Sequence, residues 1–218
     1  MNVLVVDDHP MTVDGYINAL LETSYGVPHF SFTKAYNCEQ AYHAIGKLIS
    51  TKQSFDLAII DKGLPSYKEK SILSGSELAV FINEVMPVCN IVMITAHTEI
   101  LIVYEIYKNV KPKGLIIKND LTPERLQQAI KAIADGKSYQ SPMVKACINE
   151  IWKKELMVED FNRQILFYLS KGFKIKELEE VICLTTSAIQ KRIIRMKKVF
   201  EVTDDSGLVK AAIQQGFI

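Results

Sequence analysis

Short apolar runs rich in β-branched residues alternate with stretches of helical periodicity along the first 136 residues, and this alternation constrains the fold more than any other feature. The clearest runs are Val3 to Val6, Leu57 to Ile60, Ile91 to Ile94 and Leu115 to Ile117. Phe30 to Ala35 is a poorer strand candidate, but it falls where the alternation requires a strand. Buried strands separated by helices predict a parallel sheet. We therefore expect an α/β domain in which five helices cover a doubly wound sheet of five parallel strands.

The remainder of the chain lacks a strand pattern and indicates a second, smaller domain. A chain of 218 residues, 48% of them apolar, can bury two cores. The stretch Lys137 to Pro142 has turn composition and precedes several helical patterns. These patterns cover Phe161 to Ser170, Lys176 to Ile182, Ser187 to Phe200 and Ser206 to Gln215. We predict a first domain over residues 1–136, a linker over residues 137–155 and a small all-α domain over residues 156–218.

The composition argues against several classes of protein. There is no run of about 18 apolar residues and no basic leader, so we expect a cytoplasmic protein that does not enter the membrane. The four cysteines are too scattered for a zinc site or a redox pair, and we expect reduced packing residues at Cys38, Cys89, Cys147 and Cys183. The net charge is +1, but the residues after Glu150 include 12 basic and 9 acidic ones, a balance that suits a polyanionic partner.

Charged and hydroxyl side chains follow four strands of the predicted sheet. Asp7 and Asp8 follow the first strand, and Asp61 follows the third. The carboxyl ends of parallel strands meet at one edge, where neighbouring carboxylates would repel unless a hard cation such as Mg²⁺ bound them. The fourth and fifth strands end at Thr95, a hydroxyl donor, and Lys118, a cation suited to a phosphoryl oxygen. One strand-end aspartate is usually a turn or a cap, but these five residues together predict a phosphoryl-transfer site.

These residues lie in stretches that resemble the receiver domain of two-component response regulators. The matching stretches are Val5 to Pro10, Phe55 to Asp61 with Pro65 downstream, Ile94 to Ala96, and Gly114 to Lys118. The resemblance covers about residues 1–136. It implies a flavodoxin-like fold for the first domain.

The resemblance also implies a role for each residue of the site. Asp61 would accept a phosphoryl group from a phosphohistidine on a sensor histidine kinase, while Thr95 and Lys118 would contact the phosphoryl oxygens. The Mg²⁺ ligands would be Asp7, Asp8, Asp61 and the backbone carbonyl of Gly63. Self-phosphorylation on Asp61 and slow autodephosphorylation would be the only chemistry, so we expect a timed switch rather than a turnover enzyme.

Two features depart from the receiver pattern. Leu115 stands three positions before the lysine, where the family usually has an aromatic residue that couples phosphorylation to a rotamer change. The loop at residues 66–74 is about six residues longer than usual, and it lies next to the predicted phosphorylation site. This loop is either a tolerated surface insertion or a segment that covers the site or contacts a partner.

A second candidate site lies on the helical pattern from Ser187 to Phe200. Its apolar residues recur at steps of four, three and four, which places Ile189, Ile193, Met196 and Phe200 on one buried stripe. The opposite face is basic, as expected for a surface that meets phosphates, although a solvated cationic face is an equal alternative. Its residues are Gln190, Lys191, Arg192, Ile194, Arg195, Lys197 and Lys198. Thr185 and Ser187 lie where hydroxyls cap a helix.

Residues 156–218 resemble the LuxR-type helix-turn-helix domain of the NarL/FixJ group of response regulators. The matching stretches are Gln164 to Gly172, Ile175 to Leu178, Ile182 to Thr185, and Leu208-Val209 with Ala212, Gly216 and Ile218. The resemblance implies that Ser187 to Phe200 is a recognition helix in the major groove of double-stranded DNA, with Gln190, Lys191 and Ile194 facing bases and Arg192, Arg195 and Lys198 near the phosphates. The last helix, about Asp205 to Gln215, would be the contact between two copies of the protein in a homodimer that forms on phosphorylation.

This second match has substitutions that leave an alternative open. Asn162 replaces a usual glutamate, Glu179 and Ala188 replace a small alanine and a threonine, and Arg192 replaces a histidine. An exposed Ile194 would suit either a thymine methyl group or a protein surface. We predict a phosphorylation-controlled, DNA-binding transcriptional regulator, and the rival is a signalling adaptor whose helical domain binds protein. A phosphate-hydrolysing enzyme is disfavoured because no separate general base is visible.

Overall fold

The computed structural model describes residues 1–22, 30–215 and 217–218, and it leaves the side chains of residues 154–158 undescribed. Two compact units make up the chain, Met1–Cys147 and Ile148–Ile218. Gly216, which contributes to the helix-turn-helix resemblance, lies outside the described residues. Among the described helices, none is both long and apolar enough to cross a membrane.

A parallel sheet forms the centre of the first unit, with the strand order β2-β1-β3-β4-β5-β6. The strands are β1 (Asn2–Val6), β2 (Ser31–Ala35), β3 (Leu57–Asp61), β4 (Asn90–Thr95), β5 (Gly114–Ile117) and β6 (Tyr139–Gln140). Every residue of β3 is buried, because helices cover both faces of the sheet. The predicted α/β class with a doubly wound parallel sheet is confirmed.

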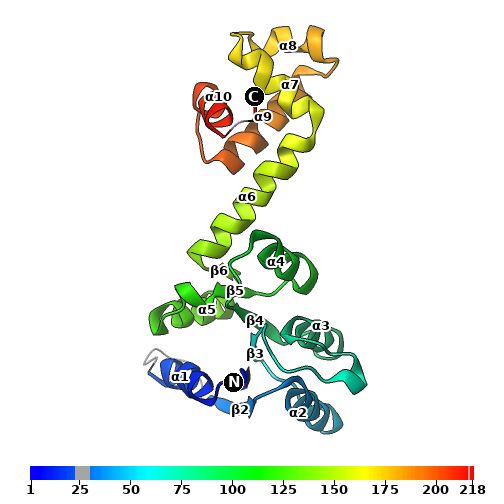
Figure 1. Ribbon diagram of the computed structural model, residues 1–218, viewed down its shortest axis with the longest axis vertical. Coiled ribbons are helices and arrows are strands. Elements are labelled where there is room, and N and C mark those ends of the chain that lie inside the picture. The colour runs from blue at the N-terminus through cyan, green and yellow to red at the C-terminus, as the bar shows by residue number, and fades with distance from the viewer. Residues whose placement is uncertain (23–29, 216) are drawn as a thin grey trace. The chain divides into compact units, whose positions relative to one another are not determined.

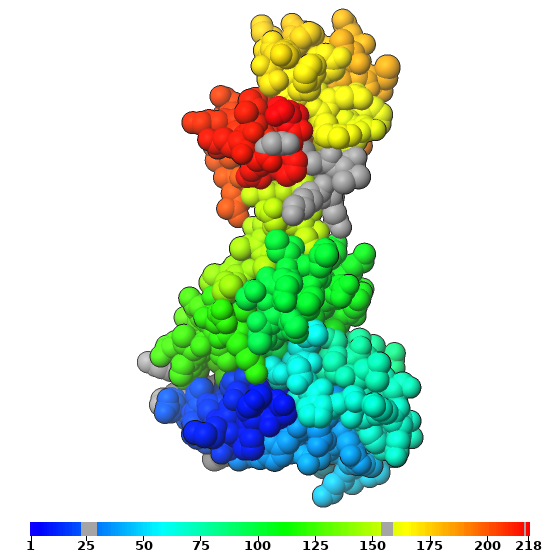
Figure 2. Space-filling view, in the orientation of Figure 1, coloured from blue at the N-terminus to red at the C-terminus, as the bar shows by residue number. Residues whose placement is uncertain are grey.

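Helices pack on both sides of this sheet (Figure 1). They are α1 (Pro10–Leu21), α2 (Cys38–Ser50), α3 (Gly75–Val85), α4 (Ile100–Glu105), continued by the π-helical turn η2 (Ile106–Val110), and α5 (Pro123–Ala134). Helices α1 and α5 share one face, where Gln127 Nε2 donates to the carbonyl of Ala19 at 2.8 Å. Figure 2 shows the N-terminal part of the chain, in blue, next to the part that is coloured green.

The prediction of five strands was wrong by one. The sixth strand, β6, has only two residues, too few for a period-two pattern to show in the sequence. It is held by backbone pairing with β5, since Tyr139 N donates to the carbonyl of Lys113 at 2.8 Å and Ser141 N donates to that of Leu115 at 3.0 Å.

Most of the segment predicted to be a linker is helical. Helix α6 (Pro142–Val158) begins directly after β6, and the boundary between the two compact units falls within it. Its start is anchored to the first unit, because Asp120 Oδ2 accepts a hydrogen bond from Met143 N at 2.7 Å and Ser141 Oγ accepts one from Ile117 N at 3.3 Å. The turn composition of residues 137–142 therefore marks a strand and a helix start instead of an irregular connection.

Four helices after α6 form the core of the second unit. They are α7 (Asp160–Ser170), α8 (Ile175–Ile182), α9 (Thr186–Phe200) and α10 (Asp205–Gln214), each within two residues of its predicted bounds. The predicted apolar stripe of α9 is buried among Leu166, Leu178 and Leu208 from the other three helices. Cys183 ends α8 in the left-handed conformation, with φ of 54°. Because its side chain is exposed, Cys183 is not the packing residue predicted, whereas the other three cysteines are buried.

Candidate functional site

The carboxyl ends of four adjacent strands bring the predicted site residues of the first unit together. The register pairs Val6 with Ile60, which places the ends of β1 and β3 side by side. It also pairs Asp61 with Ile94, and Thr95 with Ile117, so the ends of β3, β4 and β5 lie at the same level. The side chains that follow these positions meet at one edge, as the order of the strands in the sequence predicts.

Lys118 links the two most buried carboxylates of this edge. Its Nζ lies 2.9 Å from Asp61 Oδ1 and 3.1 Å from Asp7 Oδ2. Burial by itself lowers the pKa of Lys118, but the hydrogen bonds and charges of Asp61 and Asp7 outweigh it and raise the pKa above its ordinary value. The ammonium group therefore stays charged at neutral pH and offsets the negative charge of both acids.

The carboxylate of Asp7 has further hydrogen bonds from the start of α1. His9 N donates to Asp7 Oδ1 at 3.0 Å, and the hydroxyl of Tyr16 donates to Oδ2 at 3.3 Å. Burial and the neighbouring carboxylates raise the pKa of Tyr16 well above its usual range, so its proton remains in place as a donor. Asp7 was predicted from the sequence, whereas Tyr16 was not, because a tyrosine two turns along an apolar helix face has the pattern of a core residue.

Oxygen ligands for a cation are present at this edge. Asp7, Asp8 and His9 each offer a ligand atom within 4.8 Å of the others, and His9 Nδ1 lies 2.8 Å from Asp8 Oδ1. Asp61 is not in that group. Its Oδ1 is buried and, among the described residues, is approached only by Lys118. The three acids at this edge, Asp7, Asp8 and Asp61, carry more negative charge than Lys118 offsets, and this fits a hard divalent cation such as Mg²⁺.

The loop after β3 fits closely around Asp61. Gly63 N donates to Asp61 Oδ2 at 2.7 Å, and a Cβ at Gly63 would lie 3.1 Å from that same oxygen. A Cβ at Gly75 would lie 1.9 Å from the carbonyl oxygen of Asp61, a distance that no side chain tolerates. Gly75 N also donates to the carbonyl of Lys62 at 3.0 Å. The loop therefore closes on the backbone of Asp61, the phosphoacceptor candidate. This constraint on Gly75 was not predicted from the sequence.

Thr95 occupies the position predicted for a hydroxyl donor. It is fully buried at the end of β4, and its Oγ1 accepts a hydrogen bond from His97 N at 3.1 Å. Since this bond uses a lone pair, the hydroxyl hydrogen of Thr95 can still be donated. Leu115, which stands in place of the usual aromatic residue, is buried within β5 and does not belong to the exposed edge.

The long loop at residues 66–74 is folded, and Tyr67 joins it to α2. Tyr67 and Ile72 exchange backbone hydrogen bonds of 2.7 and 3.2 Å, and Ile72 is buried. The ring of Tyr67 packs against Tyr42 of α2, with 5.6 Å between ring centroids, and Tyr42 stacks on Phe81 of α3. The loop thus extends the surface over α2 and α3.

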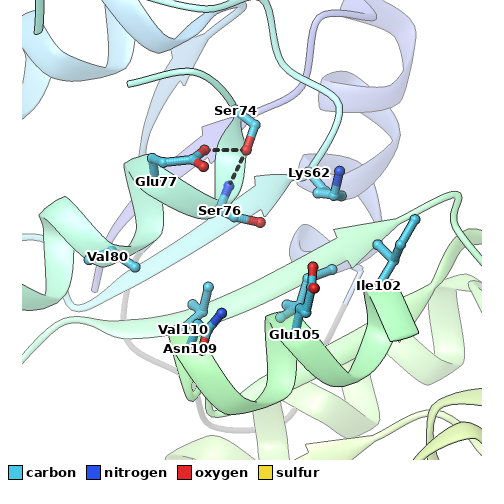
Figure 3. Close-up of a pocket in the computed structure, with 10 residues that line it drawn as sticks. Lys62, Ser74, Ser76, Glu77, Val80, Ile102, Glu105, Asn109 and Val110 are labelled. Atoms are coloured by element: carbon cyan, nitrogen blue, oxygen red, sulfur yellow. Dashed lines mark hydrogen bonds between the residues drawn. The ribbon is translucent and has the colours of Figure 1, made fainter. Parts of the chain in front are cut away.

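A cavity of about 240 Å³ adjoins this loop between α3 and the segment formed by α4 and η2 (Figure 3). At its rim Ser74 caps α3, since its Oγ accepts a hydrogen bond from Ser76 N at 3.2 Å and also contacts Glu77. Lys62 and Glu105 line it from other elements, so the lining carries mixed charge. None of the predicted site residues lines this cavity.

In the second unit, α9 presents the predicted polar face. Thr185 caps the helix by accepting a hydrogen bond from Ala188 N at 3.3 Å. The predicted contact residues that are exposed are Gln190, Lys191, Ile194, Arg195 and Lys198. Arg192, also predicted to contact phosphate, is half-buried and bonded to α7 and the residue before it. The structure therefore places five of the six predicted residues at the surface and one partly inside the domain.

Known proteins similar to this chain cover both of its units. No protein-family model matches the chain. The transcriptional regulatory protein MctR of Rhizobium johnstonii is 24% identical over 220 residues, which cover all of this chain and 95% of MctR. The response regulator RcsB of Salmonella typhimurium, which has also been solved as a complex with DNA, superposes with a TM-score of 0.59 at 19% identity, and 98% of each chain is covered.

A LuxR-family response regulator from Aurantimonas is 25% identical, with a TM-score of 0.55, over 68% of this chain and 95% of the other. These relatives confirm the resemblance to two-component response regulators that the motifs predicted. They also confirm the fold, a receiver unit followed by a helix-turn-helix unit.

Proposed function

We propose that the protein is a transcriptional response regulator that accepts a phosphoryl group on Asp61 and binds double-stranded DNA through α9. The observation that carries the proposal is the buried pair of carboxylates, Asp7 and Asp61, that share the ammonium of Lys118 at the carboxyl edge of the sheet. Full-length similarity to MctR and to RcsB, which has been solved with DNA, supports the second half of the proposal.

The geometry around Asp61 suits in-line phosphoryl transfer. The carboxylate of Asp61, whose Oδ2 is held by Gly63 N and whose Oδ1 pairs with Lys118, would be the nucleophile: a P–O bond forms there as the P–N bond to the phosphohistidine of a sensor kinase breaks. Lys118 and the hydroxyl of Thr95 would then move onto the phosphoryl oxygens and offset their charge. Mg²⁺, when held by Asp7, Asp8, Asp61 and the carbonyl of Gly63, would supply further charge neutralisation. Apart from slow autodephosphorylation, we infer no enzymatic turnover.

Intact-mass measurement with a small phosphodonor tests the phosphoryl-transfer half. The parent should gain one phosphate adduct in a Mg²⁺-dependent manner, and Asp61→Asn should gain none. Asp56→Asn, a change at the other aspartate near β3, is the matched control because Asp56 bonds the backbone of Asn2 outside the site. A full adduct on Asp61→Asn, or undiminished labelling in the presence of a chelator, would exclude Asp61 as the phosphoacceptor.

The DNA-binding half rests on the exposed basic face of α9. Arg195 and Lys198 are three residues apart, so they share one side of the helix and can contact a phosphate backbone, while Lys191, one turn before Arg195, is the residue proposed to face the bases. We further propose a homodimer in the phosphorylated state, because two recognition helices are needed to read inverted half-sites. Light scattering with and without phosphodonor measures this, and a monomer under both conditions at DNA-binding concentrations would contradict it. The cytoplasm is the compartment that this function requires.

A protein-binding adaptor is the second candidate, and exposed apolar residues of the second unit favour it. Ile194 on α9 is 66% exposed, and Phe167 and Val181 are exposed on α7 and α8. Such residues are typical of protein interfaces. Retention on DNA that falls steeply with salt supports the regulator, whereas no retention at low salt supports the adaptor.

A further inference from the structure

Helix α7 begins at a residue that does not cap it. Glu159 occupies the N-cap position, where Ser, Thr, Asp or Asn would usually accept a hydrogen bond from the backbone of the first turn. Its side chain makes no such bond. Instead, its carboxylate oxygens face α9: Oε2 pairs with Arg192, and Oε1 lies 3.7 Å from the guanidinium of Arg195. Glu159, at the N-cap position of α7, therefore pairs with α9, the proposed recognition helix.

The two arginines differ in how tightly they are held. Arg192 also donates to Asn162 Oδ1 at 3.1 Å, and its guanidinium lies 5.6 Å from the ring centroid of Phe161. Its side chain is 30% exposed, whereas that of Arg195 is 68% exposed. Arg192 thus anchors Glu159 in place, and Arg195 is the partner that a second anion can reach.

Glu159 and a DNA phosphate would bind the same group. Arg195 lies on the same side of α9 as Lys198, and both are proposed to contact the DNA backbone. A carboxylate fixed beside a guanidinium neutralises part of the charge that would otherwise attract a phosphate. A phosphate that approaches Arg195 would therefore compete with Glu159 for the guanidinium and gain less from the contact.

We propose that Glu159 is an intramolecular counter-anion of α9, which competes with the DNA backbone for Arg195 and weakens binding to any DNA sequence. This inference rests on the proposed DNA-binding function. It assigns Arg192 a positioning role, because that residue holds Glu159 rather than the DNA. A domain of this kind would bind non-specific DNA weakly and would depend more on its base contacts for affinity.

The test is Glu159→Gln in the full chain, treated with phosphodonor and titrated with a short duplex of random sequence at several salt concentrations. The exposed ion pair to Arg195 has a modest strength, so we expect binding about two- to fivefold tighter, with a steeper loss of affinity as salt rises. Glu180→Gln removes the same charge from an exposed position on α8 and should change affinity less. Glu159→Gln should bring no gain in affinity when it is added to Arg195→Ala, so the double variant should bind DNA as Arg195→Ala does.

Each alternative result has a distinct meaning. If Glu159→Gln binds no more tightly than Glu180→Gln, or if the gain persists without Arg195, the counter-anion role is refuted. A lower Tm of Glu159→Gln without tighter binding would show that Glu159 only joins α7 to α9, which also refutes it. If the parent binds duplex DNA normally in these experiments, the proposed function survives either result. If neither the parent nor any variant binds DNA, the proposed function fails and the inference fails with it.

Discussion

Replacing Lys118 with methionine should destabilise the first unit, because it leaves two buried carboxylates without their shared cation. Asp7 is fully buried and Asp61 nearly so, and Lys118 Nζ lies 3.1 and 2.9 Å from them. Removing one partner of a buried ion pair costs about 3 to 5 kcal/mol. Since the side chain of Lys118 is 28% exposed, solvent screening reduces this figure, and we expect a loss of about 2 kcal/mol in the free energy of unfolding at pH 7.

The loss should depend on pH in a defined direction. In the parent, the raised pKa of Lys118 means that its contribution is fully present below about pH 10.5 and is lost as the pH rises through the higher pKa of the folded protein. The difference in stability between Lys118→Met and the parent should therefore shrink as the pH rises above about 10.5.

Urea denaturation monitored by circular dichroism measures these differences. Mg²⁺ should stabilise Lys118→Met more than the parent, because the cation replaces the missing positive charge and does not compete with the ammonium group. Lys131→Met, on the exposed face of α5, is the matched control and should change stability by less than about 0.5 kcal/mol. If Lys118→Met is no less stable than Lys131→Met, the shared ammonium does not hold the two carboxylates together and the reasoning is refuted.

Three further predictions concern substitutions of single residues. Gly75→Ala should lower the free energy of unfolding, measured in urea titrations, by about 2 to 3 kcal/mol, because its Cβ would lie 1.9 Å from a carbonyl oxygen. The control is Gly46→Ala in α2, which has open space around it and should raise the free energy of unfolding by about 0.5 to 1 kcal/mol. Tyr16→Phe should lower the free energy of unfolding by about 1 kcal/mol, since it removes one donor to a buried carboxylate, and an unchanged Tm would show that this hydrogen bond contributes nothing. In titrations of a preferred and a scrambled duplex, Lys191→Ala should reduce the preference between them, while Arg195→Ala should weaken both about equally; equal effects of the two changes would contradict the division between base and phosphate contacts.

Much of the candidate site could be predicted from the sequence because it depends on where strands end. The apolar runs that end at Val6, Ile60, Ile94 and Ile117 are local features, and the parallel arrangement places the residues after them at one edge. The buried stripe of α9 has the same origin, since residues three or four apart share a helix face. In both cases a short-range pattern determines which side chains point inward.

Contacts between distant segments have no comparable pattern in the sequence, and the tertiary structure decides them. The strand β6 and the start of α6 depend on hydrogen bonds to β5 and to Asp120, which carry no periodicity of their own. The bonds from Tyr16 to Asp7 and from Arg192 to Glu159 join residues on different elements. A basic helix face predicts phosphate contacts whichever residues surround it, and only the packing of α7 against α9 shows that a carboxylate already lies beside two of its arginines. The reason is physical: periodicity reports burial along one element, whereas the partner of a charged group is set by how several elements pack together.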